Sequence, residues 1–367
     1  MRIGITGGNG FLGWHLRVFL HGQPGVQVTV AGRDVFAEPA RLRDFVATQD
    51  SIFHFAGMNR GDEAEVERTN LALTDALITA VTAAQSRPQI VFANSTHRDR
   101  ASAYGRAKRE SARRLSLWAG EFGTPFVDLV LPGLFGEHGR PFYNSVVSTF
   151  CHQLSRGETP VVHEDRTIEL VHAQTVAAEC RRLALSRGAG EIVIAGRTIG
   201  VRPLLARLSE MLTRYRARVI PDLADPFDLA LFNTMRSYLY PNHYPVALDL
   251  RADQRGALFE AVRTEHGGQC FLSTTAPGIT RGNHYHRAKF ERFCVVRGRA
   301  RISLRRLFDP EAVHFDVSGD APSYVDMPTF HTHSITNTGD EELLTLFWAH
   351  EFFDPARPDT YSEPVHA

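Results

Sequence analysis

Apolar and polar residues alternate in two different ways along this chain. In the first half, short apolar segments are separated by longer segments in which apolar residues recur every three or four positions. The predicted strands lie at residues 2–6, 26–32, 51–57, 88–95 and 125–133, and the predicted helices at 11–22, 68–85 and 105–123. Strands that alternate with helices indicate an α/β fold with a parallel, doubly wound sheet. We interpret residues 191–228 as an appendage of this domain.

The pattern changes near residues 240–250, which are rich in Pro, Tyr and Asn and are typical of a linker. Beyond the linker, turn residues separate short apolar segments at 259–264, 267–278, 291–307, 313–319, 323–330 and 343–353. Short strands with frequent turns predict a small all-β sandwich or barrel. We therefore expect two domains, at residues 1–243 and 244–367.

Composition narrows the class of protein. The 367 residues are 43% hydrophobic, and 41 Lys and Arg residues balance 41 Asp and Glu residues. Balanced charge disfavours a dedicated binder of nucleic acid or anionic membranes, because both need a positive field. We find no signal peptide and no apolar window of about 18 residues. The four cysteines form no C-x-x-C pair, so we expect a soluble cytoplasmic protein without disulfides.

A glycine string follows the first predicted strand. Gly7, Gly10 and Gly13 form G-x-x-G-x-x-G, and the helix opens with Phe11 and Leu12. Such glycines allow a tight turn and close approach of a pyrophosphate, whose charge is favoured at a helix N-terminus. In this strand–turn–helix context the string predicts a dinucleotide site, against the alternative of an ordinary glycine-rich turn.

The end of the second predicted strand bears on cofactor choice. A site selective for NAD usually holds the ribose 2′-hydroxyl with a carboxylate near this point, but the chain has Ala31, Gly32 and Arg33. An arginine suits a 2′-phosphate, so we predict NADPH. Asp34 follows directly and keeps NADH open, and a solvated surface charge is the alternative for Arg33.

Tyr104 and Lys108 form Y-x-x-x-K at the start of a predicted helix. The spacing of four places both side chains on one helix face. A nearby ammonium lowers the pKa of a phenol, so the tyrosine is a candidate for proton transfer near neutral pH. Ser95 ends the preceding strand and is a candidate to hold a substrate carbonyl, with Thr96 as the alternative.

Together these features resemble the extended short-chain dehydrogenase/reductase family. The resemblance is carried by TGGNGFLG, HFAG at His54–Gly57, Asn70, Ser95 and YGRAK. It implies a Rossmann-type fold, a nicotinamide cofactor and a catalytic set of Ser95, Tyr104 and Lys108. The implied cofactor contacts are Gly7, Gly10, Phe11, Leu12, Gly13, Arg33, Ala56, Gly57, Tyr104 and Lys108. The gap from Ser95 to Tyr104 is shorter than is usual in that family.

Histidines cluster in the second half. His284, His286 and Glu291 lie in G-x5-H-x-H-x4-E-x6-G, and PTFHTH supplies His333 further on. Residues i and i+2 of a strand share a face, so the first two imidazoles point the same way. Three imidazoles and one carboxylate suit a divalent ion with open positions, namely zinc or alternatively iron, manganese or nickel.

This spacing resembles both motifs of the cupin family, which implies a jelly-roll fold. Phe330 stands where a glycine is common, and the extra imidazole of His331 leaves the fourth ligand open. A degenerate cupin without metal and a purely structural set are the alternatives. Asp253, Arg255 and Gly256 also resemble the D-x-R-G-x-F motif of cupin-type sugar epimerases, against a turn with a salt bridge.

A reductase followed by a cupin resembles the CapF-type family of bifunctional capsule and O-antigen precursor enzymes. The resemblance implies a homodimer in which the cupin is a zinc-dependent C3 epimerase of a UDP-2-acetamido-2,6-dideoxy-4-hexulose. The first domain would then reduce the C4 ketone with NADPH. The implied product is UDP-N-acetyl-6-deoxy-L-talosamine, on the route to N-acetyl-L-fucosamine. Leu131 and Gly133 depart from that family near the presumed sugar pocket, and Asn144 is expected to contact the sugar or its diphosphate.

Two other functions remain open. One is a sensor that binds NADP(H) without turnover and uses the cupin as a ligand module. The other is a dehydrogenase fused to a metal-dependent dioxygenase, because the same ligands suit Fe(II). The epimerase base also stays open, with four candidates: His331, Tyr285, Lys289 and Tyr324.

Overall fold

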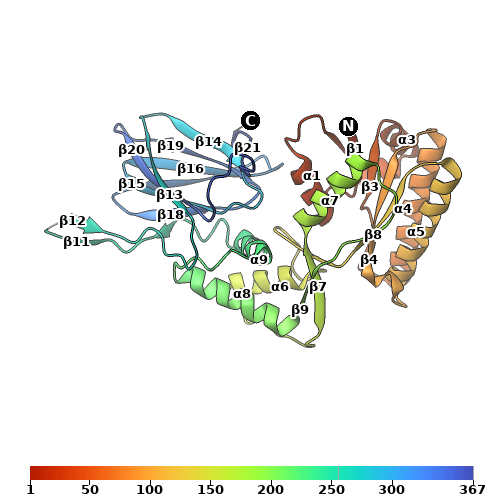
Figure 1. Ribbon diagram of the computed structural model, residues 1–367, viewed down its shortest axis with the longest axis horizontal. Coiled ribbons are helices and arrows are strands. Elements are labelled where there is room, and N and C mark those ends of the chain that lie inside the picture. The colour runs from red at the N-terminus through yellow and green to blue at the C-terminus, as the bar shows by residue number, and fades with distance from the viewer. Residues whose placement is uncertain (255, 367) are drawn as a thin grey trace. The chain divides into compact units, whose positions relative to one another are not determined.

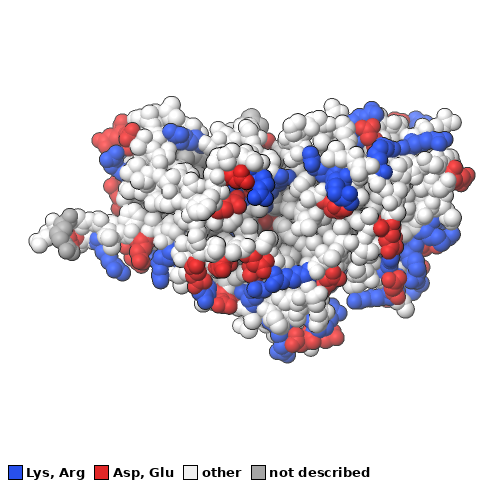
Figure 2. Space-filling view, viewed as in Figure 1, with Lys and Arg blue, Asp and Glu red and all other residues white. Residues whose placement is uncertain are grey.

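The computed structural model describes residues 1–254 and 256–366, and the chain forms two compact units (Figure 1). Unit 1 consists of Met1–Phe135, Gly139–Ser145 and Glu164–Val201. Unit 2 consists of Gly136–His138, Val146–His163 and Arg202–Ala367. On the face shown in Figure 2, basic and acidic side chains alternate over short distances, as the balanced charge predicts.

Unit 1 contains a six-stranded sheet in the order β2-β1-β3-β4-β5-β8, and all its neighbouring strands are parallel. Its strands are β1 (Arg2–Thr6), β2 (Gln27–Ala31), β3 (Ser51–His54), β4 (Gln89–Ser95), β5 (Phe126–Leu131) and β8 (Gly190–Val193). The first five match the predicted strands, so the expected doubly wound α/β fold is confirmed. A small sheet follows, of β6 (Gly133–Phe135), β7 (Thr167–His172) and β9 (Arg197–Gly200).

Helices cover both faces of this sheet, and each face has its own apolar core. On one face, α1 (Phe11–Leu20) packs with α7 (Ala173–Ser186) over the sheet. On the other face lie α3 (Pro39–Ala47), α4 (Glu63–Ala83) and α5 (Ala103–Phe122) (Figure 1). A short helix, α2 (Arg33–Ala37), follows β2. The buried strands between two helical layers explain why their sequences are almost continuously apolar.

Unit 2 contains two antiparallel five-stranded sheets, in the orders β10-β18-β15-β20-β13 and β17-β16-β19-β14-β21. The first has β10 (Val246–Ala247), β13 (Gln269–Thr275), β15 (Glu291–Arg297), β18 (Ser323–Met327) and β20 (Leu343–Ala349). The second has β14 (Thr280–Tyr285), β16 (Arg299–Arg306), β17 (Ala312–Ser318), β19 (His331–Asn337) and β21 (Tyr361–Ser362). Their inner faces share one apolar core, which confirms the predicted all-β jelly-roll fold class.

This unit differs from the sequence prediction in several details, and strands β14 and β19 lie outside the predicted segments. Residues 259–264 were expected to form a strand, but only Thr264 pairs, in an isolated bridge with Ile220. Asp253 and Gly256 lie in a two-stranded hairpin of β11 (Arg251–Asp253) and β12 (Gly256–Leu258). Arg255, the middle residue of that motif, lies outside the described residues.

Three helices also belong to unit 2: α6 (Val146–Ser155), α8 (Val201–Arg216) and α9 (Pro226–Ser237). A buried polar network ties the last two helices to the sheets. Asp326 accepts two hydrogen bonds from Arg292, at 2.7 and 3.0 Å, and one from the Tyr215 hydroxyl of α8 at 2.5 Å. Arg236 of α9 donates to the Met327 carbonyl at 2.6 Å. Unpaired buried charges are costly, so α8 and α9 stabilise this network by pairing with it. The predicted domain boundary at 243/244 would instead group both helices with the first domain.

Among the helices that the described residues form, none has the length and apolar character needed to span a membrane.

Candidate functional site

The glycine string forms the turn between β1 and α1. Gly7 has φ +69°, and a Cβ atom there would lie 2.7 Å from the Ala56 backbone nitrogen. A Cβ atom on Gly13 would collide with the Gly7 carbonyl oxygen. Only glycine lets the turn after β1, the start of α1 and the loop at Ala56 approach so closely. The N-terminus of α1, at Gly10 and Phe11, therefore points to the space above the turn. This arrangement fits a pyrophosphate.

The loop after β3 flanks this turn. The Ala56 backbone N–H donates to the Thr6 hydroxyl at 3.2 Å. Asn70 of α4 is buried, accepts from the Met58 N–H at 3.1 Å and donates to the Met58 carbonyl at 2.6 Å. A Cβ atom on Gly57 would lie 2.7 Å from the Asn70 side-chain oxygen. Asn70 therefore holds in place the loop that contains Ala56 and Gly57, two of the predicted cofactor contacts.

Arg33 begins α2 directly after β2 and is exposed. Its neighbour Asp34, which kept NADH open, forms an ion pair with Arg41 at 2.9 Å. Within the described part of the chain, the Arg33 guanidinium has no side-chain partner. The Arg33 guanidinium is therefore available to bind a ribose 2′-phosphate, whereas the Asp34 carboxylate is paired with Arg41.

Ser95, Tyr104 and Lys108 come together at the carboxyl end of β4. The Ser102 hydroxyl caps α5 by accepting from the Gly105 N–H at 3.2 Å, so Tyr104 falls in the first turn and Lys108 one turn later. The Lys108 ammonium donates to the Ala93 carbonyl at 2.5 Å and lies 5.7 Å from the Tyr104 ring centroid. Ser95 hydrogen-bonds to Tyr104, whereas Thr96 is exposed, so the geometry favours the serine.

Burial decides the charge states of this trio. It raises the pKa of Tyr104 to about 12, and the hydrogen bond to Ser95 opposes the rise only in part. The predicted lowering of this phenol pKa by Lys108 is not found, because loss of hydration outweighs it. Burial also lowers the pKa of Lys108 to about 8, against the pull of the Asp128 carboxylate. Tyr104 is thus a neutral phenol, the form that gives a proton to an alkoxide.

A polar chain behind Ser95 escaped the sequence analysis. Asn94 accepts from the Ser95 backbone N–H at 2.8 Å and donates to the Asp128 carboxylate at 2.8 and 3.1 Å. Arg98 donates to Asp128 and to Glu191, each at 2.9 Å. These partners come from three strands and a turn far apart in sequence, and no local pattern signals them.

Asn144 lies exposed in the segment Gly139–Ser145 of unit 1. The neighbouring Tyr143 hydroxyl donates to the Asn59 side-chain oxygen at 2.6 Å, and Arg60 donates to the Phe142 carbonyl at 3.0 Å. The segment is therefore tied to the loop that follows Gly57.

In unit 2, the structure brings His284, His286, Glu291 and His333 together, with their ligand atoms all within 4.8 Å of one another. His284 of β14 pairs directly with His333 of β19 in the strand register. A bulge at Asn283, which has φ +59°, shifts the register next to this pair. Glu291 begins β15 on the other sheet, so the cluster lies between the two sheets.

Backbone carbonyls orient two of the imidazoles. His286 Nδ1 lies 2.6 Å from the Asp359 carbonyl oxygen, and His333 Nδ1 lies 3.2 Å from that of His331. A carbonyl only accepts, so each Nδ1 carries the proton and each Nε2 is left with a lone pair. The buried Nε2 of His333 has no hydrogen-bond partner among the described residues, and the Nε2 of His286 lies 3.0 Å from a Glu291 oxygen. Orphaned lone pairs beside a carboxylate fit a divalent cation.

The pKa shifts of His284, His333 and Glu291 agree with this interpretation. Burial lowers the pKa of His284 to about 4 and that of His333 well below its ordinary value. Burial alone would raise the pKa of Glu291, but the attraction of His286 outweighs it and the pKa falls to about 2. The same carboxylate outweighs burial at His286, whose pKa is raised. An ionised carboxylate and neutral imidazoles are the forms that bind metal.

His331 lies outside this cluster. Its Nδ1 is 2.9 Å from the Thr329 carbonyl oxygen, and its ring packs edge-on against Tyr240 at 4.6 Å. The structure thus selects His333, not His331, as the fourth ligand candidate. Two of the other base candidates also face elsewhere, because Tyr285 stacks on Tyr361 and Tyr324 lies under the Arg292 guanidinium.

A pocket of about 230 Å³ opens beside Glu291. Its other lining residues are Gln269, Phe271, Lys289, Ala349, Glu351 and Phe353. Of the four base candidates, Lys289 is the one that lines this pocket.

Comparisons with known proteins cover both units. Residues 3–196 match the NAD dependent epimerase/dehydratase family, and residues 251–361 match the polysaccharide biosynthesis C-terminal domain. A Pseudomonas aeruginosa protein, UDP-2-acetamido-2,6-beta-L-arabino-hexul-4-ose reductase, is 30% identical over 99% of this chain and 98% of its own length.

Solved structures give the same picture. The capsular polysaccharide assembling protein CapF from Staphylococcus aureus is 30% identical and aligns with a TM-score of 0.65 over 99% of this chain and 100% of its own. The UDP-glucose 4-epimerase of Thermus thermophilus is 18% identical, aligns with a TM-score of 0.53 over 66% of this chain and 100% of its own, and shares the fold alone.

Family membership implies a nicotinamide cofactor, which the glycine turn of unit 1 fits. The family model covers more than half of the chain, and the CapF-like relatives match it from end to end. This chain therefore belongs to the NAD-dependent epimerase/dehydratase family and is a CapF-like member of it.

Proposed function

We propose that this chain is a bifunctional UDP-sugar enzyme of capsule or O-antigen precursor synthesis. The four-ligand site between the β-sheets of unit 2 catalyses epimerisation at C3 of a UDP-2-acetamido-2,6-dideoxy-4-hexulose. Unit 1 then reduces the C4 ketone with NADPH. The product is UDP-N-acetyl-6-deoxy-L-talosamine. The observation that carries this proposal is the presence, in one chain, of a proton-donor set at Tyr104 and a four-ligand cluster at His284. A full-length relative named as a reductase of such a hexulose supports it.

For the reduction, Tyr104 is the proton donor. Bound cofactor supplies the hydride, and the oxygen at C4 then gains the negative charge of an alkoxide. The Ser95 hydroxyl holds that oxygen, and the neutral Tyr104 phenol passes its proton to it. The Lys108 ammonium, held by the Ala93 carbonyl, favours the phenolate that remains.

For the epimerisation, the C4 ketone makes the C3 proton acidic. A divalent ion, zinc by this proposal, would be held by His284, His286, Glu291 and His333 and would supply Lewis-acid stabilisation of the enolate. The carbonyls of Asp359 and His331 keep two of these imidazoles in the required tautomer. Return of a proton to the opposite face of C3 inverts its configuration.

The test is incubation of the enzyme with the UDP-4-hexulose and NADPH, followed by NMR of the product. We expect inversion at C3 and a hydroxyl at C4, with lower catalytic efficiency when NADH replaces NADPH, because Arg33 is available and Asp34 is paired. Reduction without inversion rejects the epimerase half. Substrate-dependent oxygen consumption would identify a dioxygenase instead, and cofactor binding without turnover a sensor.

Asp128→Asn is expected to move the alkaline limb of the reduction rate to lower pH. Lys108 has a pKa of about 8, and the Asp128 carboxylate raises it, so removing that charge lets the ammonium lose its proton at lower pH. The other titratable groups around Lys108 are Tyr104, with a pKa of about 12, and His54, which burial lowers to a pKa of about 3. Both are uncharged near neutral pH.

The measurement is kcat/KM for reduction between pH 6 and about 9, the range that brackets this pKa. Glu191→Gln is the matched control, because it removes the other carboxylate bound to Arg98 but not the one that faces Lys108. An unchanged alkaline limb in Asp128→Asn would contradict the assignment.

A further inference from the structure

The chain contains 39 arginines and two lysines, Lys108 and Lys289. Arginine thus serves almost everywhere that a positive charge or a hydrogen-bond donor is needed. The two side chains differ in shape, because a guanidinium is a planar fork and an ammonium is a compact point charge with three rotatable donors. In so arginine-rich a chain, a buried lysine is a candidate for a position where the compact ammonium matters. Lys108 is such a position, since it lies beside Tyr104 and Ser95.

Lys289 is the second such position. It lies in the turn between His286 and Glu291, and only 6% of its surface is exposed. Its ammonium donates to the Pro358 carbonyl at 2.6 Å and lies 5.9 Å from the ring centroid of Phe353. One carbonyl uses one of the three ammonium donors, so donors remain for another partner.

The pocket beside Glu291 is where that partner would lie. Lys289 is the single basic side chain among the described residues that line it. Glu291, one of the four ligand candidates, lines the same pocket. The Lys289 side chain and the Glu291 carboxylate of the four-ligand cluster therefore line the same open pocket.

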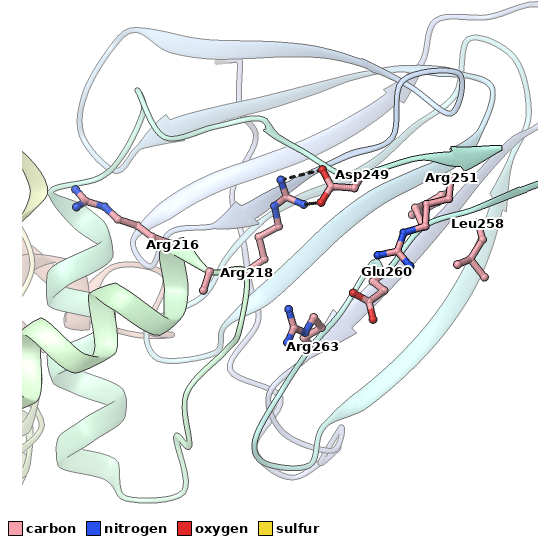
Figure 3. Close-up of a pocket in the computed structure, with 9 residues that line it drawn as sticks. Arg216, Arg218, Asp249, Arg251, Leu258, Glu260 and Arg263 are labelled. Atoms are coloured by element: carbon pink, nitrogen blue, oxygen red, sulfur yellow. Dashed lines mark hydrogen bonds and ion pairs between the residues drawn. The ribbon is translucent and has the colours of Figure 1, made fainter.

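A second pocket of the same unit gives the contrast. It is larger, about 320 Å³, and its four basic residues are all arginines: Arg216, Arg218, Arg251 and Arg263. Figure 3 shows Arg218 in its bidentate contact with Asp249, and Arg251 and Arg263 near Glu260. In this second pocket, arginine thus supplies all the positive charge of the lining. The lysine beside Glu291 needs a different explanation.

We propose that Lys289 is a catalytic residue of the epimerase site, whose ammonium donates a hydrogen bond to the C4 oxygen of the ketosugar. This inference rests on the proposed function and adds the group that binds the reacting oxygen. The oxygen gains negative charge when C3 loses its proton, and a donor already held in position stabilises that charge. The ammonium keeps its own proton throughout. The base that accepts the C3 proton is a separate group.

The competing role for Lys289 is structural, as a clamp on the Pro358 carbonyl. An arginine also donates to a carbonyl, so Lys289→Arg separates the two roles, and Lys289→Met removes both. The assay is incorporation of deuterium at C3 of the UDP-4-hexulose in D2O, without NADPH, using zinc-loaded enzyme. We expect both variants to lose about 100-fold or more in exchange rate, the usual loss on removal of one such donor.

Zinc content and NADPH affinity should stay at the wild-type level in Lys289→Arg. Arg301→Lys is the matched control, because Arg301 is exposed and paired with Asp316 in the same unit, and it should exchange at the wild-type rate. Exchange by Lys289→Arg within about threefold of wild type would overturn the inference, as would loss of zinc from that variant. Absence of exchange in the wild type would instead reject the epimerase function, and this inference with it.

Discussion

Tyr104→Phe is expected to abolish reduction of the 4-ketosugar while C3 exchange in D2O continues. In the proposed function Tyr104 supplies the proton for the C4 alkoxide, and loss of a general acid commonly costs about 10²–10⁴-fold in rate. The four-ligand cluster belongs to the other compact unit, so the substitution leaves it intact. Reduction is measured as NADPH oxidation, and exchange as loss of the C3 proton signal in NMR.

Exchange is the internal control in this experiment, because it reports a folded unit 2 in the same sample. If Tyr104→Phe also stopped exchange, the two reactions would be coupled or Tyr104 would have another role. Reduction at the wild-type rate would remove the phenol from the mechanism. Either outcome contradicts the assignment of Tyr104 as the proton donor.

His286→Ala is expected to prevent binding of the proposed divalent ion and with it C3 exchange. His286 is buried, its Nδ1 is held by the Asp359 carbonyl and its Nε2 faces the cluster. Changes in groups that merely orient a metal ligand commonly cost about 10–100-fold, so removal of a ligand should cost at least that much in zinc affinity. Zinc content is measured by elemental analysis, and exchange in D2O without NADPH. Enzyme treated with a chelator should behave in the same way.

His314→Ala is the matched control, because His314 is an exposed histidine of the same unit whose Nδ1 contacts Ser303 outside the cluster. It should retain both zinc and exchange. NADPH binding at the glycine turn of unit 1 should survive in both variants. Undiminished deuterium uptake in enzyme shown to be metal-free would contradict the Lewis-acid role and leave the ion as a link between the two sheets.

Strands β1, β3, β4 and β5 were predictable because they are mostly buried between helical layers, so that their sequences are largely apolar. Six helices of the described residues, α2, α3, α6, α7, α8 and α9, were not predicted as elements. In α9 the buried face contains Asp228, Asn233 and Arg236, so the apolar period that signals a helix is interrupted. Some of those polar groups contact residues distant in the chain, for example Arg236 with the Met327 carbonyl.

The candidate sites divide in the same way. Residues that form short spacings, such as His284 and His286 or Tyr104 and Lys108, were found from the sequence. The choice between His331 and His333 needed the strand register, which pairs His333 with His284. The pKa of Tyr104 was predicted in the wrong direction, because burial of a side chain cannot be derived from a spacing.

Unit 2 is built from segments that are separated in sequence by part of unit 1, and this order has a consequence for synthesis on the ribosome. Helix α6 buries Val147, Phe150 and Cys151 and packs against α9, which ends at Ser237. At about 5–20 residues per second, α6 leaves the ribosome roughly 4–16 seconds before the whole of its partner does. Its apolar face must stay covered during that interval, by chaperones or by temporary contacts within the nascent chain. Expression of this protein should accordingly depend on translation speed between residues 155 and 237 more than on speed within unit 1.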